Sequence, residues 1–221
     1  MRQFSFNDFI FILSATRWTV LLSLLAFALG GVLGGAIAVL RISSHAPVRL
    51  AASAYIQLFQ GTPLLMQLFL VYYGLGLFGL RVDAWTAVTI VYTAYAAAFL
   101  GDIWRGCIQA IPKEQWEASR ALALGYLPQL LLIIVPQAVR IAIPPTVGFL
   151  VQLVKATAVA SIIGFVELTR AGQLMTSATF QPIIVYPIIA GLYVSLCWPL
   201  SIWSQRLEKR LRVDNAIGRR T

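Results

Sequence analysis

The chain has 221 residues, of which 59% are hydrophobic and only 11% are charged, and its formal net charge is +9. Soluble domains carry about 25% charged residues, so this composition excludes an ordinary water-soluble fold and predicts one all-α membrane domain with a few spans. The basic residues flank apolar runs, which is typical of residues that orient spans in a membrane and does not favour nucleic-acid binding.

Five apolar segments are long enough to cross a lipid bilayer, since a helical span needs about 20 residues. In chain order they cover residues 18–40, 52–80, 85–111, 130–163 and 183–203. The first is too long for the apolar part of a cleavable signal peptide, and its closely spaced glycines predict a face for close helix packing. These glycines are Gly30, Gly31, Gly34 and Gly35.

Proline and polar residues predict the breaks between and within these segments. Gln60-Gly61-Thr62-Pro63 predicts a kink in the second segment, and Arg81-Val82-Asp83 predicts a tight turn after it. The fourth segment is interpreted as a short amphipathic helix that turns into a span around Pro144, and residues 167–181 as a polar connector. The chain is then a single transmembrane domain with a core over 16–207, a polar loop over 112–140 and a basic tail over 205–221.

An odd number of spans places the two termini on opposite sides of the membrane. With the tail inside, 12 of the 17 Lys and Arg residues face the cytoplasm, in line with the positive-inside rule. We therefore expect a multi-pass protein with its N-terminus outside and with its C-terminus and polar loop in the cytoplasm.

The residue patterns of catalytic and metal sites are missing. Cys107 and Cys197 lie far apart inside apolar runs, where the expected role of a cysteine is small apolar filler, and His45 has no acids nearby in sequence. The chain has no motif of a serine hydrolase, a zinc protease or a nucleotide-binding loop. The sequence therefore predicts no catalytic residues, no metal site and no cofactor bound by this chain.

The polar loop carries the signals of two short helices. Pro112 suits the start of a helix, and Glu114 and Glu117 lie in its first turns, where the helix dipole favours acids. Gly125 then offers a turn, and Pro128 suits the start of a second helix. This spacing alone fits an ordinary surface loop as well as a docking element for a partner in the cytoplasm.

The loop also resembles a motif of the permease subunits of bacterial ABC importers: Glu-Ala-Ala, three residues, Gly, nine residues, Ile, one residue, Leu-Pro. This chain has Glu117-Ala118-Ser119, then Ala123, Ile133 and Val135-Pro136 at the same spacing. It departs from the motif at positions 119, 123 and 135. Since glycine at position 123 would allow a sharp turn, we expect Gly125 to supply the turn two residues later.

Other segments resemble the polar amino-acid branch of these permeases, the histidine- and glutamine-type proteins. They are Gln60-Gly61-Thr62-Pro63-Leu64, Ala94-Tyr95, Asp102-Ile103-Trp104-Arg105-Gly106, Val135-Pro136-Gln137-Ala138, Lys155-Ala156-Thr157 and Val166-Glu167-Leu168-Thr169-Arg170. Gln60 stands where arginine is usual, Asp102 where glutamate is commoner, and Ala156 where an acid is usual. The chain is identified by these matches as a member of that branch, which implies a type I ABC importer fold with cytoplasmic coupling helices.

The resemblance implies ATP-driven uptake across a bacterial cytoplasmic membrane, with no enzyme activity in this chain itself. The implied partners are ATP-binding cassette ATPase subunits, which bind ATP and magnesium, a second permease copy or a sister permease, and an extracytoplasmic solute-binding protein. The residues expected to contact the ATPase are Glu114, Glu117, Ala118, Ser119, Arg120, Ala121, Leu122, Ala123 and Gly125.

Polar residues inside membrane spans usually face an interior or a water-filled path, so they are candidates for a substrate pathway. Here they are Gln60, Thr62, Gln67, Tyr95, Asp102, Lys155 and Thr157. Asp102 also has the spacing for an ion pair with Arg105, and Lys155 equally fits a snorkelling or inter-subunit role. The missing acid at Ala156 favours polar or acidic amino acids over doubly cationic ones, while opines and related derivatives stay open.

Other functions also fit a polytopic helical membrane protein. A secondary transporter or channel needs no ATPase, but the chain shows no inverted repeat and does have a loop suited to docking. A membrane scaffold would transport nothing. Related importer branches carry sugars, ions or peptides, whereas the Gly-Thr-Pro-Leu and Glu-Leu-Thr-Arg elements favour amino acids.

Overall fold

The computed structural model describes residues 2–217, with side chains placed from Arg2 to Lys209 and at Leu211. Within that range every regular element is helical; η1 and η2 are π-helical turns and η3 is a 3-10 helix. The elements are α1 (Phe6–Arg41), α2 (Ala46–Gly61), α3 (Leu64–Phe69), η1 (Leu70–Gly74), α4 (Leu75–Leu77), α5 (Ala84–Gln109), α6 (Lys113–Ala121), α7 (Tyr126–Pro128), η2 (Gln129–Ile134), α8 (Val135–Ala156), η3 (Thr157–Ile163), α9 (Leu168–Thr179) and α10 (Pro182–Ile217). Part of the predicted basic tail, including Arg219 and Arg220, lies outside the described residues.

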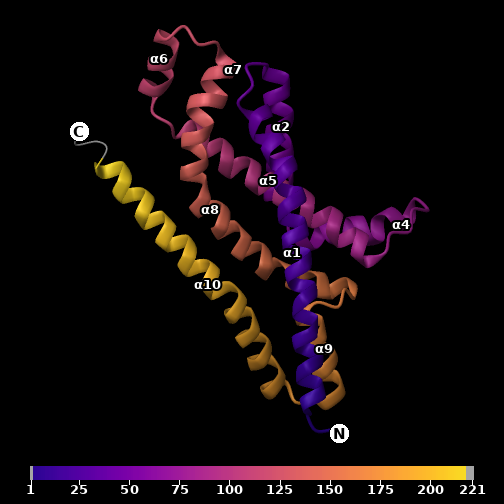
Figure 1. Ribbon diagram of the computed structural model, residues 1–221. Helices are drawn as coiled ribbons and strands as arrows, with labels where there is room; N and C mark the ends of the chain where they lie inside the picture. Colours follow the sequence, from indigo (N-terminus) through magenta and orange to yellow (C-terminus); the bar gives the residue numbers. More distant parts are fainter. Residues whose placement is uncertain (1, 218–221) are drawn as a thin grey trace.

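Five crossings of a membrane fit this arrangement. Among the described residues, four helical segments are long and apolar enough to span, namely Phe6–Arg41, Ala84–Gln109, Tyr126–Ile163 and Pro182–Lys209. The pair Ala46–Gly61 and Leu64–Leu77, whose halves meet at 101°, has the geometry of a broken span or a re-entrant loop and makes a fifth crossing in the first case. Figure 1 shows the N-terminus and the C-terminal end of α10 at opposite ends of the molecule, as an odd number of crossings requires. The predicted kink at residues 60–63 is therefore a sharp bend.

Glycine residues let α1 and α5 pack closely. A methyl group on Gly30 would lie 2.5 Å from the Cβ atom of Ala96, and one on Gly34 would lie 3.1 Å from backbone atoms of α5. By contrast, a methyl group on Gly31 would first meet Trp104, at an ordinary contact distance of 3.6 Å. The predicted small-residue face therefore exists, and Gly30 and Gly34 lie at its contact with α5.

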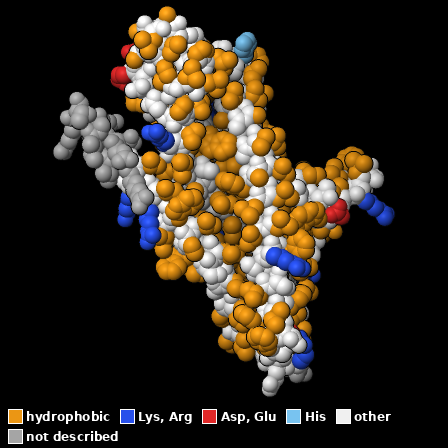
Figure 2. Space-filling view, viewed as in Figure 1, with side chains coloured by type: hydrophobic (Ala, Val, Ile, Leu, Met, Phe, Trp, Pro, Cys, Tyr) orange, Lys and Arg blue, Asp and Glu red, His pale blue; other side chains and the backbone are white. Residues whose placement is uncertain are grey.

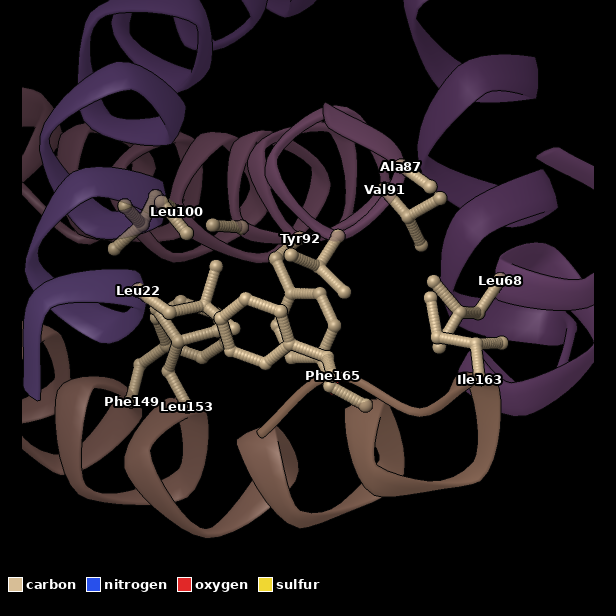
Figure 3. Close-up of a cluster of buried hydrophobic side chains, with 14 residues drawn as sticks. Leu22, Leu68, Ala87, Val91, Tyr92, Leu100, Phe149, Leu153, Ile163 and Phe165 are labelled. Carbon is tan, nitrogen blue, oxygen red and sulfur yellow. The ribbon is translucent and has the colours of Figure 1, made fainter. Parts of the chain in front are cut away.

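The main core lies where α1, α3, α5, α8 and η3 meet (Figure 3). Leu22, Leu68, Tyr92 and Leu153 are fully buried there. The Tyr92 hydroxyl donates a hydrogen bond of 2.8 Å to the Ala156 carbonyl, which satisfies its polar atom and ties the middle of α5 to the end of α8. The core thus holds together spans that are distant in the sequence.

The fourth span differs from the prediction of a break near Pro144. Pro144 and Pro145 lie inside α8, and the helical run continues from Tyr126 to Ile163. Proline is tolerated inside membrane helices where neighbouring side chains satisfy the freed backbone groups. The prolines lack an N–H and so free the carbonyls of Arg140 and Ile141, one turn earlier. The Ser204 hydroxyl of α10 donates a hydrogen bond of 2.9 Å to a different group, the Pro144 carbonyl, and thereby ties α10 to this part of α8. The predicted start of the first span is also late, because α1 begins at Phe6.

The segment predicted as a polar connector, residues 167–181, is largely the helix α9. Glu167 is fully buried at its N-terminus, where its carboxylate accepts hydrogen bonds of 2.8 Å from the Thr169 and Arg170 amides. The Tyr193 hydroxyl of α10 donates to the same carboxylate at 3.0 Å. A buried cap with three donors therefore starts a helix that composition alone did not indicate.

Apolar side chains cover much of the outer surface, as Figure 2 shows over α1 and α8. Val32 in α1 is 76% exposed and Ile183 in α10 is 88% exposed. Monomeric soluble proteins rarely expose contiguous apolar areas on this scale. The outward faces of the spans are therefore suited to a lipid bilayer or to other membrane helices.

Candidate coupling surface and pathway residues

A helical hairpin formed by α6 and α7 lies at the end of the molecule opposite the N-terminus (Figure 1). The helix α6 follows Pro112 and ends at Ala121, and the chain then reverses through Ala123, whose φ is +56°. The amides of Ala123 and Leu124 bond back to carbonyls of α6, at 2.9 and 3.4 Å. The expectation that Gly125 makes this turn is wrong, because Gly125 has φ −68° and caps α7.

The hairpin is fixed to the spans by packed rings and hydrogen bonds. The rings of Trp116 and Tyr126 stack with centroids 6.2 Å apart, and the Gln129 amide donates to the Leu124 carbonyl. A buried cluster at its base joins the end of α5 to η2 and the start of α8 through Ile108, Ile134 and Ala138, among others. The hairpin is therefore held against the spans by packed and hydrogen-bonded contacts.

The side of α6 away from the spans is open. Of the residues expected to contact an ATPase, Ser119 is buried and its hydroxyl donates to the Trp116 carbonyl at 2.8 Å, so it stabilises α6 from within. Glu117 and Leu122 are exposed, Leu122 by 72%. The other expected contact residues are also exposed: Glu114, Ala118, Arg120, Ala121, Ala123 and Gly125.

The two acids of this helix, Glu114 and Glu117, are unpaired among the described residues. In the part of the chain that the structure describes, Glu114 and Glu117 make no hydrogen bond and no ion pair. Two uncompensated carboxylates beside an exposed leucine form a surface with both charge and apolar area, which suits a protein partner.

The polar side chains at the bend between α2 and α3 bond mainly to backbone carbonyls near the bend. The Gln67 amide donates to the Phe59 carbonyl at 2.9 Å and to the Thr62 hydroxyl at 2.8 Å. The Thr62 hydroxyl in turn donates to the Leu58 carbonyl. Gln60 is exposed. Thr62 and Gln67 therefore satisfy backbone groups freed by the bend, which explains why polar residues are needed inside this span.

The other expected pathway residues have different surroundings. Tyr95 lies against Phe99, with ring centroids 4.5 Å apart, and Thr157 is buried with its hydroxyl donating to the Val154 carbonyl of α8. Asp102 forms an ion pair of 2.7 Å with Arg105. Lys155 is exposed and makes no ion pair with any described residue.

The structure separates Asp102 from Lys155. Tyr92 bonds to the end of α8, and the Trp104 indole donates to the Thr146 hydroxyl in its middle, which fixes the alignment of α5 against α8. This alignment places the two charged residues roughly 10 Å apart along the helix axes, at 1.5 Å per residue. They do not form one site within a single chain.

Sequence reasoning gave Glu167 no role, although it lies in one of the segments that resemble the family. Burial raises the pKa of this carboxyl, while the hydrogen bonds that it accepts from the Thr169 and Arg170 amides lower it in part. A signal was available, because a lone acid directly before an apolar residue and a threonine fits a helix N-cap.

These features define a polytopic helical membrane protein with the type I ABC importer permease fold. The chain belongs to the family described as "Binding-protein-dependent transport system inner membrane component", whose model matches residues 30–213.

Several relatives match over almost their whole length. The chain is 36% identical to the probable glutamine ABC transporter permease protein GlnM of Bacillus subtilis, over 93% of this chain and 95% of that protein. It is 33% identical to the L-cystine transport system permease protein TcyB of the same organism, over 88% and 83%. It is 31% identical to the octopine transport system permease protein OccM of Rhizobium radiobacter, over 96% and 94%.

Solved structures agree with this assignment. A crystal structure of an amino acid ABC transporter with histidines superposes with a TM-score of 0.87 at 32% identity, covering 95% of this chain and all of that chain. The MetNI methionine ABC transporter in an inward-facing conformation matches with a TM-score of 0.77 at 19% identity, covering 94% and 99%, which supports the fold alone.

Proposed function

We propose that this chain is the membrane subunit through which an ATP-driven importer of a bacterial cytoplasmic membrane takes up a polar amino acid or an amino-acid derivative. The observation that carries the proposal is the α6–α7 hairpin, which is fixed to α5 and α8 and presents Glu117 and Leu122 to the outside. A partner bound to that surface is connected to α5 and α8 through directly packed side chains.

The assembly has parts that this chain does not supply. ATP and magnesium bind in ATP-binding cassette ATPase subunits, whose closure pulls the hairpins of two permease copies, or of sister permeases, together. A solute-binding protein delivers the substrate at the opposite face, where the N-terminus lies. ATP must favour one packing of the spans by several kcal/mol, since a ligand shifts populations only by its difference in affinity between two states.

Three observations support a neutral or acidic polar amino acid, or an opine, as the substrate. Relatives of this chain carry the names of glutamine, cystine and octopine transport proteins. Asp102 is already paired with Arg105, and the residue after Lys155 is alanine and not an acid. The remaining free charge among these residues is the exposed cation of Lys155, which favours a carboxylate over a second ammonium group.

The test is the substitution Glu117→Lys in the complete importer reconstituted in liposomes. We expect ATP hydrolysis stimulated by the solute-binding protein, and uptake of a labelled polar amino acid, to fall at least about tenfold, because a repulsive charge at a contact costs more than one kcal/mol. Gln3→Lys introduces a lysine, with a charge change of +1 instead of +2, at an exposed residue of the opposite end and should leave both activities unchanged.

Three results would contradict the proposal. Normal coupled uptake by the Glu117→Lys importer would exclude the hairpin as the ATPase contact. Uptake that follows an ion gradient without ATP would identify a secondary transporter or channel instead. Full competition by arginine but not by glutamine would overturn the substrate class while leaving the importer assignment intact.

A further inference from the structure

We infer that a cavity beside the hairpin is a binding site for the phosphodiester headgroup of an anionic phospholipid. The cavity has a volume of about 340 Å³ and lies where the loop between α1 and α2, the end of α5 and the hairpin meet. Its lining residues are Arg41, Ile42, Ser43, Arg49, Ile108, Gln109, Trp116 and Tyr126. None of these residues belongs to the surface proposed for the ATPase or to the pathway.

Two guanidinium groups without a counter-ion line this one cavity. Neither Arg41 nor Arg49 forms an ion pair with any described residue. The Nε atom of Arg41 is buried and has no hydrogen-bond partner, whereas Arg49 donates only to the Ser43 carbonyl, at 3.1 Å. A buried charged donor left unsatisfied is costly, and two like charges around a small cavity repel, so an anion in the cavity removes both costs.

Neutral donors complete the site. The Gln109 carbonyl oxygen accepts a hydrogen bond from Arg105, which leaves its amide group to donate toward an occupant of the cavity. Arginine side chains and neutral donors around one cavity are the chemistry that recognises a phosphate oxygen, since guanidinium groups bind phosphate with short, charge-assisted hydrogen bonds.

The surroundings favour a lipid phosphate over a free ion. Leu40 and Leu50 are exposed by 44% and 71%, and each lies one residue deeper in its span than the neighbouring arginine. Trp116 and Tyr126 place an indole and a phenol at the same level, as in the aromatic belts at membrane surfaces. A headgroup at Arg41 and Arg49 with acyl chains along the leucines satisfies both features, and basic cavities between membrane helices are known to bind such headgroups.

The site has a consequence for the hairpin because Trp116 and Tyr126 belong both to the cavity and to the stack that fixes α6. A bound headgroup would press against this stack and steady the hairpin. The inference goes beyond the proposed function, since it would hold for any protein with this cavity, whatever substrate crosses it.

The experiment measures lipid retention and thermal stability of the purified full-length importer in detergent. Phosphatidylglycerol, phosphatidylcholine and inorganic phosphate are added separately to delipidated protein, and bound lipid is counted by native mass spectrometry. For the wild type we expect retention of phosphatidylglycerol and a rise in the unfolding midpoint that phosphatidylcholine does not give. The double variant Arg41→Gln/Arg49→Gln should bind phosphatidylglycerol about tenfold more weakly, because two charge-assisted contacts are lost.

Controls separate this result from general effects of charge or folding. Arg81→Gln removes one exposed cation outside the cavity and should keep the response to phosphatidylglycerol. If the double variant fails to fold, Arg49→Gln alone is used, because Arg49 is exposed and makes a single hydrogen bond.

Three outcomes overturn the inference. Equal retention of phosphatidylglycerol by the wild type and the arginine variant shows that the cavity does not select a lipid. Equal stabilisation by inorganic phosphate shows a site for a free ion. Unchanged lipid retention with weaker ATPase binding assigns the two arginines to the protein partner.

Discussion

Ala123 is the residue on which the shape of the coupling hairpin depends. Its φ of +56° lies in the left-handed region, which costs an L-residue with a side chain roughly 1–2 kcal/mol. The family motif has glycine at this position, and the structure gives the reason, because the turn occurs there even when alanine replaces glycine. Gly125 has an ordinary backbone conformation, and a Cβ atom on it would lie 3.9 Å from Pro128.

The substitution Ala123→Gly should therefore stabilise the hairpin, by up to about 1 kcal/mol, since it relieves the strain of a positive φ. Gly125→Ala should be tolerated with normal coupled ATPase activity. Thermal unfolding in detergent and proteolysis within residues 112–128 measure the effect. Greater damage from Gly125→Ala than from Ala123→Val would show that the turn lies at residue 125 after all.

Two acidic helix caps differ in burial, and this difference predicts their importance. Glu167 is fully buried with three donors at the start of α9, whereas Asp83 is exposed at the start of α5. Glu167→Ala should cost about 2–4 kcal/mol, because it removes a cap and leaves buried donors unsatisfied. Asp83→Ala should cost clearly less. Unfolding midpoints of the two variants under one set of conditions test this order, and a larger loss for Asp83→Ala would contradict it.

Asp83 also predicts a pH effect on stability. Hydrogen bonds from Thr86, first from its side chain and then from its amide, hold the pKa of Asp83 below its usual 3.8. A lowered pKa in the folded state stabilises the fold above the unfolded pKa, and this contribution is lost as the pH falls through the folded value. The stability difference between the wild type and Asp83→Asn should therefore shrink between pH 5 and pH 3 (a window set by about one unit on either side of the unfolded pKa). If the stability difference between the two proteins grew as the pH fell, the pKa of Asp83 would not be lowered in the folded state.

At the scale of whole helices, both α1 and α5 could be predicted as spans from the sequence. The residues through which the two helices contact each other could not. The glycines of α1 predicted a small-residue face, but only the structure separates Gly30, which lies against Ala96, from Gly31, which lies against Trp104. Helical periodicity alone does not determine which neighbouring helix packs against each face of α1.

Gly30→Ala should consequently destabilise the protein by about 1–3 kcal/mol, because the new methyl group would lie 2.5 Å from the Cβ atom of Ala96 and force the helices apart. Gly31→Ala is a matched control, since it brings the same gain in helix propensity with an ordinary contact at 3.6 Å. Unfolding in detergent compares the two variants. Equal unfolding midpoints of the two variants would show that α1 and α5 can move apart at little energetic cost.

Sequence patterns predicted the spans, the bend after Gly61 and the position of the coupling helices, because long apolar runs, proline and a family motif report these features locally. They failed where tertiary contacts decide the structure. Pro144 does not end a helix: α8 continues through it, and the Pro144 carbonyl accepts a hydrogen bond from Ser204 of α10, 60 residues later. Residues 168–179 form a helix because α10 and Glu167 complete a buried cap. The pairing of Asp102 with Arg105 was one of two alternatives, and only coordinates could choose between them.

At the scale of the molecule, the two ends have different chemistry and different expected surroundings. The hairpin and the loop between α1 and α2 lie at one end, and the N-terminus and α9 lie at the other (Figure 1). Cys107 and Cys197 are both buried, so an engineered surface cysteine can be labelled over a low background.

With Gln115→Cys in the hairpin and Gln3→Cys near the N-terminus, we expect opposite reactivity toward a membrane-impermeant maleimide. Intact cells should label Gln3→Cys after the outer barrier is opened, whereas Gln115→Cys should react only in inside-out vesicles, because the positive-inside rule places the hairpin in the cytoplasm. Both residues are exposed in the structure. Labelling of both positions from the same side would refute an odd number of crossings between residues 3 and 115.

The unbroken helical run Tyr126–Ile163 has a further consequence. Its 38 residues extend for about 57 Å at 1.5 Å per residue, from the ring stack of the hairpin to the central core. A tilt of about 10° displaces one end of such a rod by about 10 Å relative to the other, a distance comparable to the size of an amino acid. A slight rotation at the hairpin would thus be amplified along one continuous helical run into a large displacement at the central core, without a relay of rearranging side chains.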